Sequence, residues 1–411
     1  MIDLDLDFVR AQFPAFSDPA LEGFAYFENA GGSYACGQVI ERLGRFYREN
    51  KLQPYYPSAP SIRAGEQMDQ SKQRLAEWLG IAVDELHFGP STSANTYVLA
   101  QALRQALQPG DEIVVTQQDH EANVGAWWRL QESGIVVREW AVDSATGELA
   151  PAGLEALLGP RTKVVAFTHC SNVVGTIHPV RRLTDLVHQA GAWAIVDGVA
   201  LSPHGLPDLA ELGADIYLFS LYKVYGPHLG AFYMRRSLNE AWPNQGHFFN
   251  AEKPSARFTP AGPDHAQIAA VGGVTDYLEA VARRHGFGDE PLPMRAASVA
   301  RLFRRHETGL LQPLLDYLAN HPRVRLLGGE SAAERAPTVA FTVAGQRPRD
   351  LATRLAESKL GVGCGHFYAY RLLQALGIDT DEGVLRISFV HYTSQDEVGR
   401  VIAALDRLLQ E

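Results

Sequence analysis

The side chain best suited to covalent chemistry is Lys223, which follows the apolar run 216–220 and precedes a Gly-Pro pair at 226–227. A lysine amine forms an imine with an aldehyde, and burial lowers its pKa so that more of the amine is neutral and nucleophilic. A lysine in the turn that follows a buried strand would have its amine in such a buried environment. Taken alone, the segment also fits an ordinary surface lysine just past a strand.

Asp197 ends another apolar run, at 193–196, and is followed by Gly198. A carboxylate at the tip of a buried strand needs a cationic partner, because leaving it unpaired is costly. A protonated pyridine nitrogen would serve, and the pairing would keep such a ring cationic and able to withdraw electrons from a bound substrate. The alternative is a strand-end aspartate that caps a helix.

Polar groups follow three further apolar runs. Thr92 and Ser93 precede a helical stretch at 97–107, where hydroxyls and backbone N–H groups suit a phosphate. His120 follows the run 111–116 and fits a ring stacked on a cofactor, and Asn172 follows the run 163–168 and offers an amide to a phenolic oxygen. Each has an ordinary alternative, respectively a capped helix start, a structural histidine and a loop amide.

The elements that must position these residues alternate between apolar strands and amphipathic helices. We expect strands at 111–116, 134–138, 163–168, 193–197, 216–220 and 230–234, with a helix at 179–190. This alternation predicts an α/β fold with a mostly parallel sheet covered on both faces, and ligands bind beyond the carboxyl ends of such strands. The candidate residues, each just after a strand, therefore predict one pocket for pyridoxal 5′-phosphate (PLP) in an enzyme that acts on an amine-bearing small molecule.

A length of 411 residues suits two domains. The region 240–275 is rich in Gly, Pro and His and reads as loop, a helical pattern covers 269–284, and helices and strands alternate again after 293. We predict an N-terminal segment at 1–20 that packs with the small domain, a large PLP-binding domain at 21–292 and a small C-terminal α+β domain at 293–411.

The net charge of −10 argues against a partner such as nucleic acid or an anionic membrane, so local geometry must capture any phosphate. The three cysteines (Cys36, Cys170 and Cys364) lie far apart, which argues against a disulfide framework or a Cys-rich zinc site and suggests a reducing compartment. The acidic N-terminus shows no secretory signal, and no stretch approaches the roughly 20 apolar residues of a membrane span. The cytoplasm is the expected location.

The segments 119–123, 171–176, 196–198 and 220–227 resemble the class V aminotransferase family of fold type I PLP enzymes, which includes cysteine desulfurases, selenocysteine lyases and isopenicillin N epimerase. The resemblance runs from 26–32 to 391–393. It implies that Lys223 is the Schiff-base lysine, Asp197 the partner of the pyridine nitrogen, His120 the stacked imidazole and Asn172 the amide beside the phenolic oxygen. The phosphate donors that it implies are Thr92, Ser93 and Ser220.

The resemblance also implies a homodimer with active sites at the subunit interface, where the segment 257–262 reaches the neighbour's phosphate. Arg386 matches an arginine that binds the substrate carboxylate, and Asn29, His366 and Tyr368 are assigned to the substrate side of the site. A bidentate guanidinium–carboxylate pair is the expected means of holding an α-amino acid.

The chain departs from the desulfurase pattern around the cofactor. Tyr222 stands where desulfurases usually carry a phosphate-binding histidine, although a phenol can still donate. Ala200 replaces a Gln or His near the ring oxygen, and Gly262 replaces a Thr of the crossing loop. These changes remove expected contacts to the cofactor.

The larger departures lie in the segment 361–369. Aligning Gly365-His366 with the family's Gly-His places Gly363 at an arginine and Tyr368 at the sulfur-accepting cysteine. A phenol cannot replace a thiol nucleophile, so the desulfurase catalytic cysteine is predicted to be lacking. Cys364, four positions before Tyr368, would substitute only if the loop bends differently.

Several functions stay open, because pocket details decide the fate of the substrate carbanion. A desulfurase-like lyase that eliminates a β-substituent without a cysteine persulfide is favoured. An aminotransferase that passes the amino group to a keto acid is the first alternative, and an epimerase the second. A non-catalytic PLP-binding protein is disfavoured, because a mere binder needs neither Lys223 nor Asp197. There is no G-x-G-x-x-G motif after a strand, no G-x-S-x-G elbow and no H-E-x-x-H metal motif.

Overall fold

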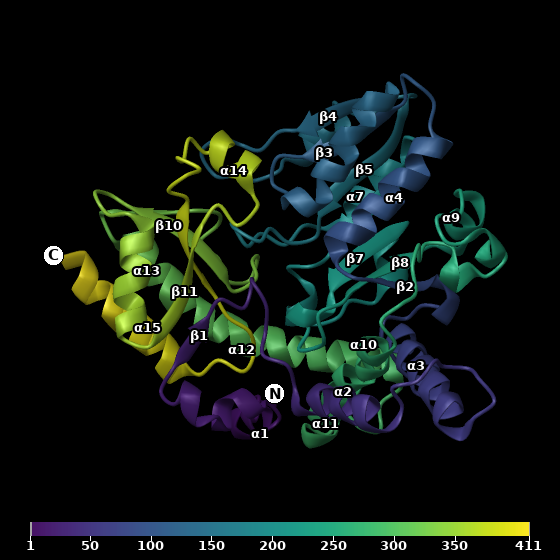
Figure 1. Cartoon of the computed structure of the whole chain (residues 1–411). Coiled ribbons are helices and arrows are strands. Elements are labelled where there is room, and N and C mark those ends of the chain that lie inside the picture. Colours follow the sequence, from purple (N-terminus) through teal and green to yellow (C-terminus); the bar gives the residue numbers. More distant parts are fainter. Residues whose placement is uncertain (1, 411) are drawn as a thin grey trace.

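The computed structural model describes residues 2–410 and contains two β-sheets flanked by helices (Figure 1). The larger sheet has the strand order β2-β8-β7-β6-β5-β3-β4. Its strands are β2 (Leu86–Gly89), β3 (Glu112–Thr116), β4 (Val136–Trp140), β5 (Thr162–Thr168), β6 (Trp193–Asp197), β7 (Ile216–Ser220) and β8 (Gly230–Met234). The pairs from β4 to β7 are parallel, and β8 runs antiparallel to both β7 and β2. The predicted mostly parallel sheet is confirmed.

Successive residues of these strands pack into different hydrophobic clusters, as a sheet buried on both faces requires. In β3, Ile113 and Val115 join a cluster with Leu99 and Trp127, whereas Val114 joins the cluster that contains Val187. Helices α4 (Thr92–Ala106) and α5 (Gly125–Trp128) therefore cover one face, and α7 (Val180–Gln189) covers the other. The near-continuous apolar runs in the sequence follow from this double coverage.

The smaller sheet has the strand order β1-β11-β12-β10-β9 and lies on the other side of the molecule in Figure 1. Its strands are β1 (Ala25–Phe27), β9 (Val324–Leu326), β10 (Thr338–Val343), β11 (Leu360–Gly365) and β12 (Val384–Ser388). Only the pair of β1 with β11 is parallel among the described strands of this sheet. The N-terminal strand thus belongs to the same sheet as the C-terminal strands, and it carries residues 25–32 toward the larger sheet.

Helix α12 (Leu292–Asn320) links the two halves, because it packs against α11 (Gly272–Arg284) and against α15 (Gln395–Gln410). The N-terminal segment also contacts both, through ion pairs of Asp5 with Arg284 and of Arg10 with Glu397. The remaining helices are α1 (Leu6–Ala11), α2 (Gly37–Glu49), α3 (Ala59–Trp78), α6 (Pro151–Glu155), α8 (Leu209–Leu212), α9 (Arg236–Ala241), α10 (His265–Ala270), α13 (Pro348–Glu357) and α14 (Tyr370–Ala375). Met1 and Glu411, at the ends of the first and last predicted ranges, lie outside the described residues.

Some element boundaries differ from those expected. The strand predicted at 134–138 begins at Val136, because Gly134 has φ +81° and ends the preceding turn. The helix predicted at 97–107 begins at Thr92, where the Ser91 side chain caps it. The region predicted as loop contains α10, and the helix predicted at 269–284 is divided at Val271 into α10 and α11.

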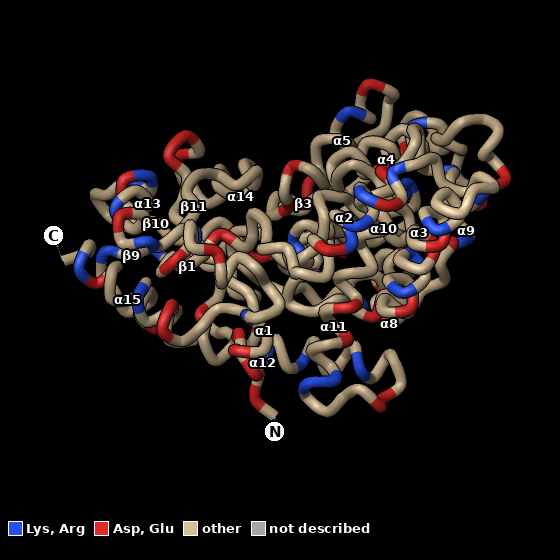
Figure 2. Tube along the Cα trace, turned by 60° about the horizontal axis from the view of Figure 1, so that its bottom comes forward, with Lys and Arg blue, Asp and Glu red and all other residues tan. Residues whose placement is uncertain are grey.

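Lys and Arg are interspersed with Asp and Glu along the trace (Figure 2). Between residues 2 and 410, no helix combines the length and apolarity that a membrane crossing demands.

Candidate active site

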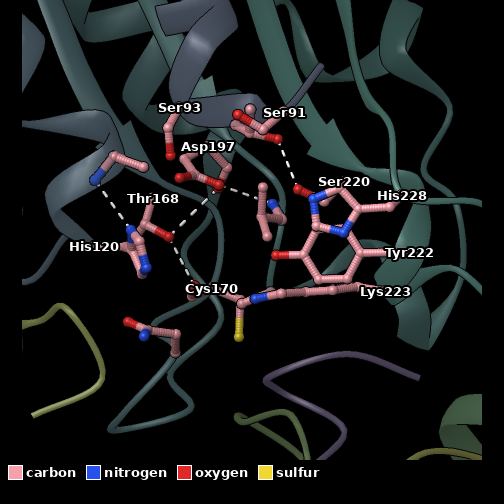
Figure 3. Close-up of a pocket in the computed structure, with 15 residues that line it drawn as sticks. Ser91, Ser93, His120, Thr168, Cys170, Asp197, Ser220, Tyr222, Lys223 and His228 are labelled. Carbon is pink, nitrogen blue, oxygen red and sulfur yellow. Dashed lines mark hydrogen bonds between the residues drawn. The ribbon is translucent and has the colours of Figure 1, made fainter. Parts of the chain in front are cut away.

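The carboxyl ends of β2, β3, β5, β6 and β7 open onto one pocket with a cavity volume of about 80 Å³. The structure brings all eight predicted cofactor residues into its lining: Thr92, Ser93, His120, Asn172, Asp197, Ser220, Tyr222 and Lys223. Figure 3 shows His120, Asp197 and Lys223 around this pocket, and they come from the turn after β3, the end of β6 and the turn after β7. The predicted substrate residues Asn29, His366, Tyr368 and Arg386 do not line it.

One end of the pocket is built from hydroxyl groups at the start of α4. Ser91 caps the helix by accepting a hydrogen bond from the Ala94 N–H at 3.1 Å. The Thr92 Oγ1 lies 2.7 Å from the Ser220 Oγ, which joins this helix start to the end of β7. Gly230 allows the approach, because a Cβ there would lie 2.3 Å from the Ser91 carbonyl carbon. The hydroxyl and backbone N–H groups at the first turn of this 15-residue helix can bind an anion.

Lys223 lies in the 3₁₀ turn η7 (Leu221–Lys223), and only 6% of its surface is exposed. Burial, aided by the charge of Arg386, lowers the pKa of the Lys223 amine to about 8, even though Asp197 and Glu28 act in the opposite direction. About a tenth of the amine is therefore neutral at pH 7, far more than for an ordinary lysine. This is the state that attacks a carbonyl carbon.

Asp197 is buried at the end of β6, where its Oδ1 accepts a hydrogen bond from the Val199 N–H at 2.8 Å. Burial raises the pKa of this carboxyl to about 6, although the Val199 hydrogen bond and the Lys223 charge favour the ionised form. The protein groups around Asp197 therefore stabilise its charged form only in part. A cation bound in the pocket would supply the remaining stabilisation.

His120 begins the turn η4 (Glu121–Asn123), and its Nδ1 accepts a hydrogen bond from the Ala122 N–H at 3.0 Å. Burial, with a smaller contribution from the Lys223 charge, lowers the pKa of His120 to about 3. The imidazole is therefore neutral, and its proton lies on Nε2 because Nδ1 is an acceptor. Its ring centroid is 4.9 Å from that of Tyr368.

Asn172 lies after β5, and its side-chain N–H₂ donates one hydrogen bond to the Phe367 carbonyl at 2.9 Å. The second hydrogen of this group is left for a bound molecule, and the Asn172 Oδ1 is buried without a hydrogen-bond partner among the described residues. An incompletely paired amide in a pocket is expected where a ligand completes the pairing.

His228 also lines the pocket, and sequence reasoning missed it. Its ring stacks on that of Tyr222 with centroids 4.7 Å apart and an angle of 7° between the planes (Figure 3). Burial raises the pKa of the Tyr222 phenol, so the phenol keeps its proton. A histidine one residue past a Gly-Pro turn has no local pattern that separates it from a surface turn residue, and only the stacking reveals it.

The four predicted substrate residues come from the smaller sheet and the loops beside it. Asn29 is buried, donates to the Ser388 carbonyl at 3.3 Å and accepts a hydrogen bond from the Tyr392 hydroxyl. His366 accepts from the Tyr368 N–H at 3.0 Å, and the exposed Tyr368 ring meets His120. Arg386 is buried and forms an ion pair with Glu28.

Comparison with known proteins identifies the family. The model of the family described as aminotransferase class-V matches residues 25–284 and 294–401. The aminotransferase-like protein FGM3 of Gibberella zeae is 34% identical over 98% of this chain and 98% of its own length. A probable cysteine desulfurase of Pseudomonas aeruginosa is 32% identical over 98% of each chain.

Solved structures agree. The cysteine desulfurase CsdA of Escherichia coli, in an S-sulfonic acid form, matches with a TM-score of 0.82 at 25% identity, over 100% of this chain and 99% of that one. The apo cysteine desulfurase of Thermococcus onnurineus matches the fold with a TM-score of 0.87 at 24% identity, over 100% and 99%. The predicted family, fold class and cofactor are thereby confirmed. The chain belongs to the class-V aminotransferase family, whose members are enzymes that depend on pyridoxal 5′-phosphate.

Proposed function

We propose that the chain is a cysteine desulfurase-like lyase that eliminates a β-substituent from an amino acid or a related amine. The observation that carries this proposal is the pairing, in one pocket, of a buried amine on Lys223 with a buried, under-stabilised carboxylate on Asp197. Relatives named as cysteine desulfurases support the removal of a sulfur substituent as the reaction type.

The residues present fit PLP. Thr92, Ser93 and Ser220 would hold the phosphate at the start of α4, and Asp197 would hold the protonated pyridine nitrogen. His120 would lie against the ring, and Asn172 would donate to its phenolic oxygen through the remaining amide hydrogen. We add His228, which through its stacking on Tyr222 supports the phosphate end in place of the histidine that desulfurases usually carry there.

Bound PLP supplies an aldehyde carbon and a cationic ring that withdraws electrons from the substrate α-carbon. Lys223 would hold the aldehyde carbon of PLP, and its Nζ would accept the proton from the substrate α-carbon. A pKa of about 8 suits this task, because the amine both takes up and releases a proton near neutral pH. The neutral His120, with its proton on Nε2, would donate a hydrogen bond to a departing group.

The proposed lyase works without a persulfide on a cysteine. Cys364 is exposed on β11, and partial burial of its thiol raises its pKa, which lowers the fraction of reactive thiolate. Cys170 lines the pocket, but burial raises the pKa of its thiol to about 12. Neither thiol is prepared as a nucleophile.

We further propose that the enzyme is a homodimer in the cytoplasm. The segment that follows Arg257 lines a second pocket together with Pro90 and His228, next to the proposed phosphate end. Phe248 and Phe249, shortly before this segment, are largely exposed, as is typical of a surface that a second subunit covers. Light scattering of the purified enzyme tests the dimer, and a monomer at micromolar concentration would contradict it.

Borohydride reduction followed by peptide mapping tests the cofactor linkage, and a pyridoxyl group on Lys223 is the expected result.

Purified enzyme is then mixed with a panel of amino acids and amines, with and without a keto-acid acceptor. Release of sulfide or of a keto acid without the acceptor supports elimination. Conversion of the cofactor to its amine form, with turnover only when the acceptor is present, would instead identify an aminotransferase. Lack of a pyridoxyl tag on Lys223 would refute the whole assignment.

A further inference from the structure

The turn that carries Lys223 is followed by a strained tyrosine. Tyr225, two residues after Lys223, has φ +60°, a left-handed conformation that is unfavourable for a bulky side chain. Among the five described non-glycine residues with positive φ, Tyr225 alone is buried. Such a conformation persists only where surrounding contacts hold it, and residues in it cluster at active sites. The contacts of Tyr225 therefore bear on how Lys223 is held.

The residues on either side of Lys223 are hydrogen-bonded to the segment that follows β1. The Tyr222 carbonyl accepts from the Ser33 N–H at 3.1 Å. The Tyr225 carbonyl accepts from the Cys36 N–H at 3.0 Å. Lys223 lies between these two anchored residues, so a displacement of Tyr225 reaches Lys223 through a single intervening residue.

The Tyr225 hydroxyl belongs to a buried chain of hydrogen bonds. It donates to the Pro203 carbonyl, in the 3₁₀ turn η6 (Ser202–His204), and this uses its only hydrogen. The His391 Nδ1, 3.2 Å from the same hydroxyl oxygen, must therefore donate to it. Burial lowers the pKa of His391 well below its ordinary value, so the neutral ring has no second N–H, and its Nε2 accepts from the Tyr277 hydroxyl at 2.5 Å. The chain thus runs in one direction, from Tyr277 through His391 and Tyr225 to Pro203.

His391 is itself fixed by packing. It is fully buried after β12, and its ring stacks on that of Phe303 in α12, with centroids 3.5 Å apart and an angle of 10° between the planes. Its partner Tyr277 lies in α11. A buried polar network that is fully paired fixes one arrangement of the groups that it joins. This network therefore ties the turn that carries Lys223 to α11, to α12 and to the segment after β12.

We propose that His391 is a positioning residue for Lys223. By donating to the Tyr225 hydroxyl it holds the left-handed turn, and this sets where the Lys223 Nζ enters the cofactor pocket. His391 does not line that pocket, so it acts through Tyr225 and the backbone that joins Tyr225 to Lys223. This inference rests on the proposed function, because it assumes that Lys223 binds PLP.

The test removes PLP from the purified holoenzyme and follows its return to the full-length chain, as the Lys223 amine adds to the aldehyde and one water leaves. Stopped-flow absorbance at increasing PLP concentrations separates two quantities. The half-saturating concentration reports how well the pocket binds PLP before the amine reacts, and the limiting rate reports the attack of the amine on bound PLP. A misplaced amine is expected to lower the limiting rate alone, by about 10- to 100-fold.

Two substitutions of His391 separate placement from packing. In His391→Asn the amide nitrogen lies near the position of Nδ1 and can still donate to Tyr225, whereas in His391→Gln the amide lies near the position of Nε2 and can still pair with Tyr277. Both variants lose the ring and one hydrogen bond, so urea unfolding should show similar losses of stability. His391→Asn is expected to keep the limiting rate within about threefold of the parent, and His391→Gln to lower it by at least about tenfold. Equal limiting rates in the two variants would overturn the inference.

Tyr225→Phe removes the hydroxyl and keeps the ring, and it gives a second test in case the His391 variants fold poorly. It is expected to lower the limiting rate by at least about tenfold and to leave the half-saturating PLP concentration within about twofold. Tyr317→Phe in α12 is the matched control, because it removes a buried hydroxyl that has no hydrogen-bond partner among the described residues, and it should change neither quantity. An unchanged limiting rate in Tyr225→Phe would also overturn the inference.

The two levels of the proposal fail differently. If borohydride leaves no pyridoxyl group on Lys223 of the parent enzyme, the proposed function and this inference fall together. If Lys223 is labelled and the two His391 variants react with PLP at the same limiting rate, only the positioning role falls.

Discussion

Replacing Asp197 with asparagine is expected to stabilise the cofactor-free protein while weakening its hold on PLP. The carboxyl group is 5% exposed, and burial raises its pKa from 3.8 to about 6. Above pH 6 the folded chain must therefore keep a charge that burial disfavours, at a cost of about 3 kcal/mol relative to the unfolded chain. Asparagine removes this cost and retains an oxygen to accept the Val199 N–H.

The sign of the pH dependence follows from the direction of the pKa shift. Both the folded and unfolded forms are protonated well below pH 3.8, so parent and variant have equal stability there as far as this group is concerned. The difference in the free energy of unfolding between Asp197→Asn and the parent grows as the pH rises from 3.8 to 6. It reaches about half its full size at pH 5 and is constant above about pH 7. Urea unfolding of the cofactor-free proteins at pH 5 and pH 7.5 measures it, with the exposed Asp381→Asn as control.

Cofactor affinity is expected to change in the other direction. Loss of a charged hydrogen bond of about 1.5–3 kcal/mol raises the dissociation constant for PLP by about 10- to 100-fold, measured by equilibrium dialysis. A variant that is no more stable than the parent at pH 7.5, or an advantage that does not shrink at pH 5, would refute the pKa argument. Unchanged PLP affinity would refute the assignment of Asp197 to the pyridine nitrogen.

Three further changes test other parts of the site. The rate at which PLP binds the cofactor-free protein should rise about tenfold between pH 7 and pH 9, as the neutral fraction of Lys223 increases through its pKa of about 8, and a flat stopped-flow profile would contradict a role for this amine. Gly230→Ala should lower the free energy of unfolding by about 1–3 kcal/mol and weaken PLP binding, because its Cβ would push the Ser91 backbone away from β8. Its control, Gly309→Ala in α12, meets no neighbouring atom and should raise stability by about 0.5–1 kcal/mol, so equal effects in urea unfolding would count against the steric argument. Cys364→Ser should leave the rate of β-substituent release unchanged, whereas loss of turnover would assign the thiol a catalytic role.

The cofactor end of the site could be predicted from sequence because its determinants are local. Each candidate residue follows an apolar strand by a few positions, and parallel strands bring their carboxyl ends to one edge of the sheet. The level register of β5, β6 and β7, with Thr168 opposite Asp197 and Asp197 opposite Leu218, places the residues that follow these strands at the same edge. Strand periodicity and chain order were therefore enough to predict that Asp197, Asn172 and Lys223 line one pocket.

The substrate end was decided only by the tertiary structure. Glu28, Gly363 and Arg386 lie on three strands or strand ends of the smaller sheet that are far apart in the chain, and nothing near any of them indicates the other two. A buried guanidinium pairs with whichever acceptor the packing brings nearest. The sequence therefore showed that Arg386 is present, but it did not show that Arg386 forms an ion pair with Glu28 of the same chain. The stacking of His228 on Tyr222 has the same origin, because a ring contact depends on how two turns pack and leaves no periodic signal in the sequence.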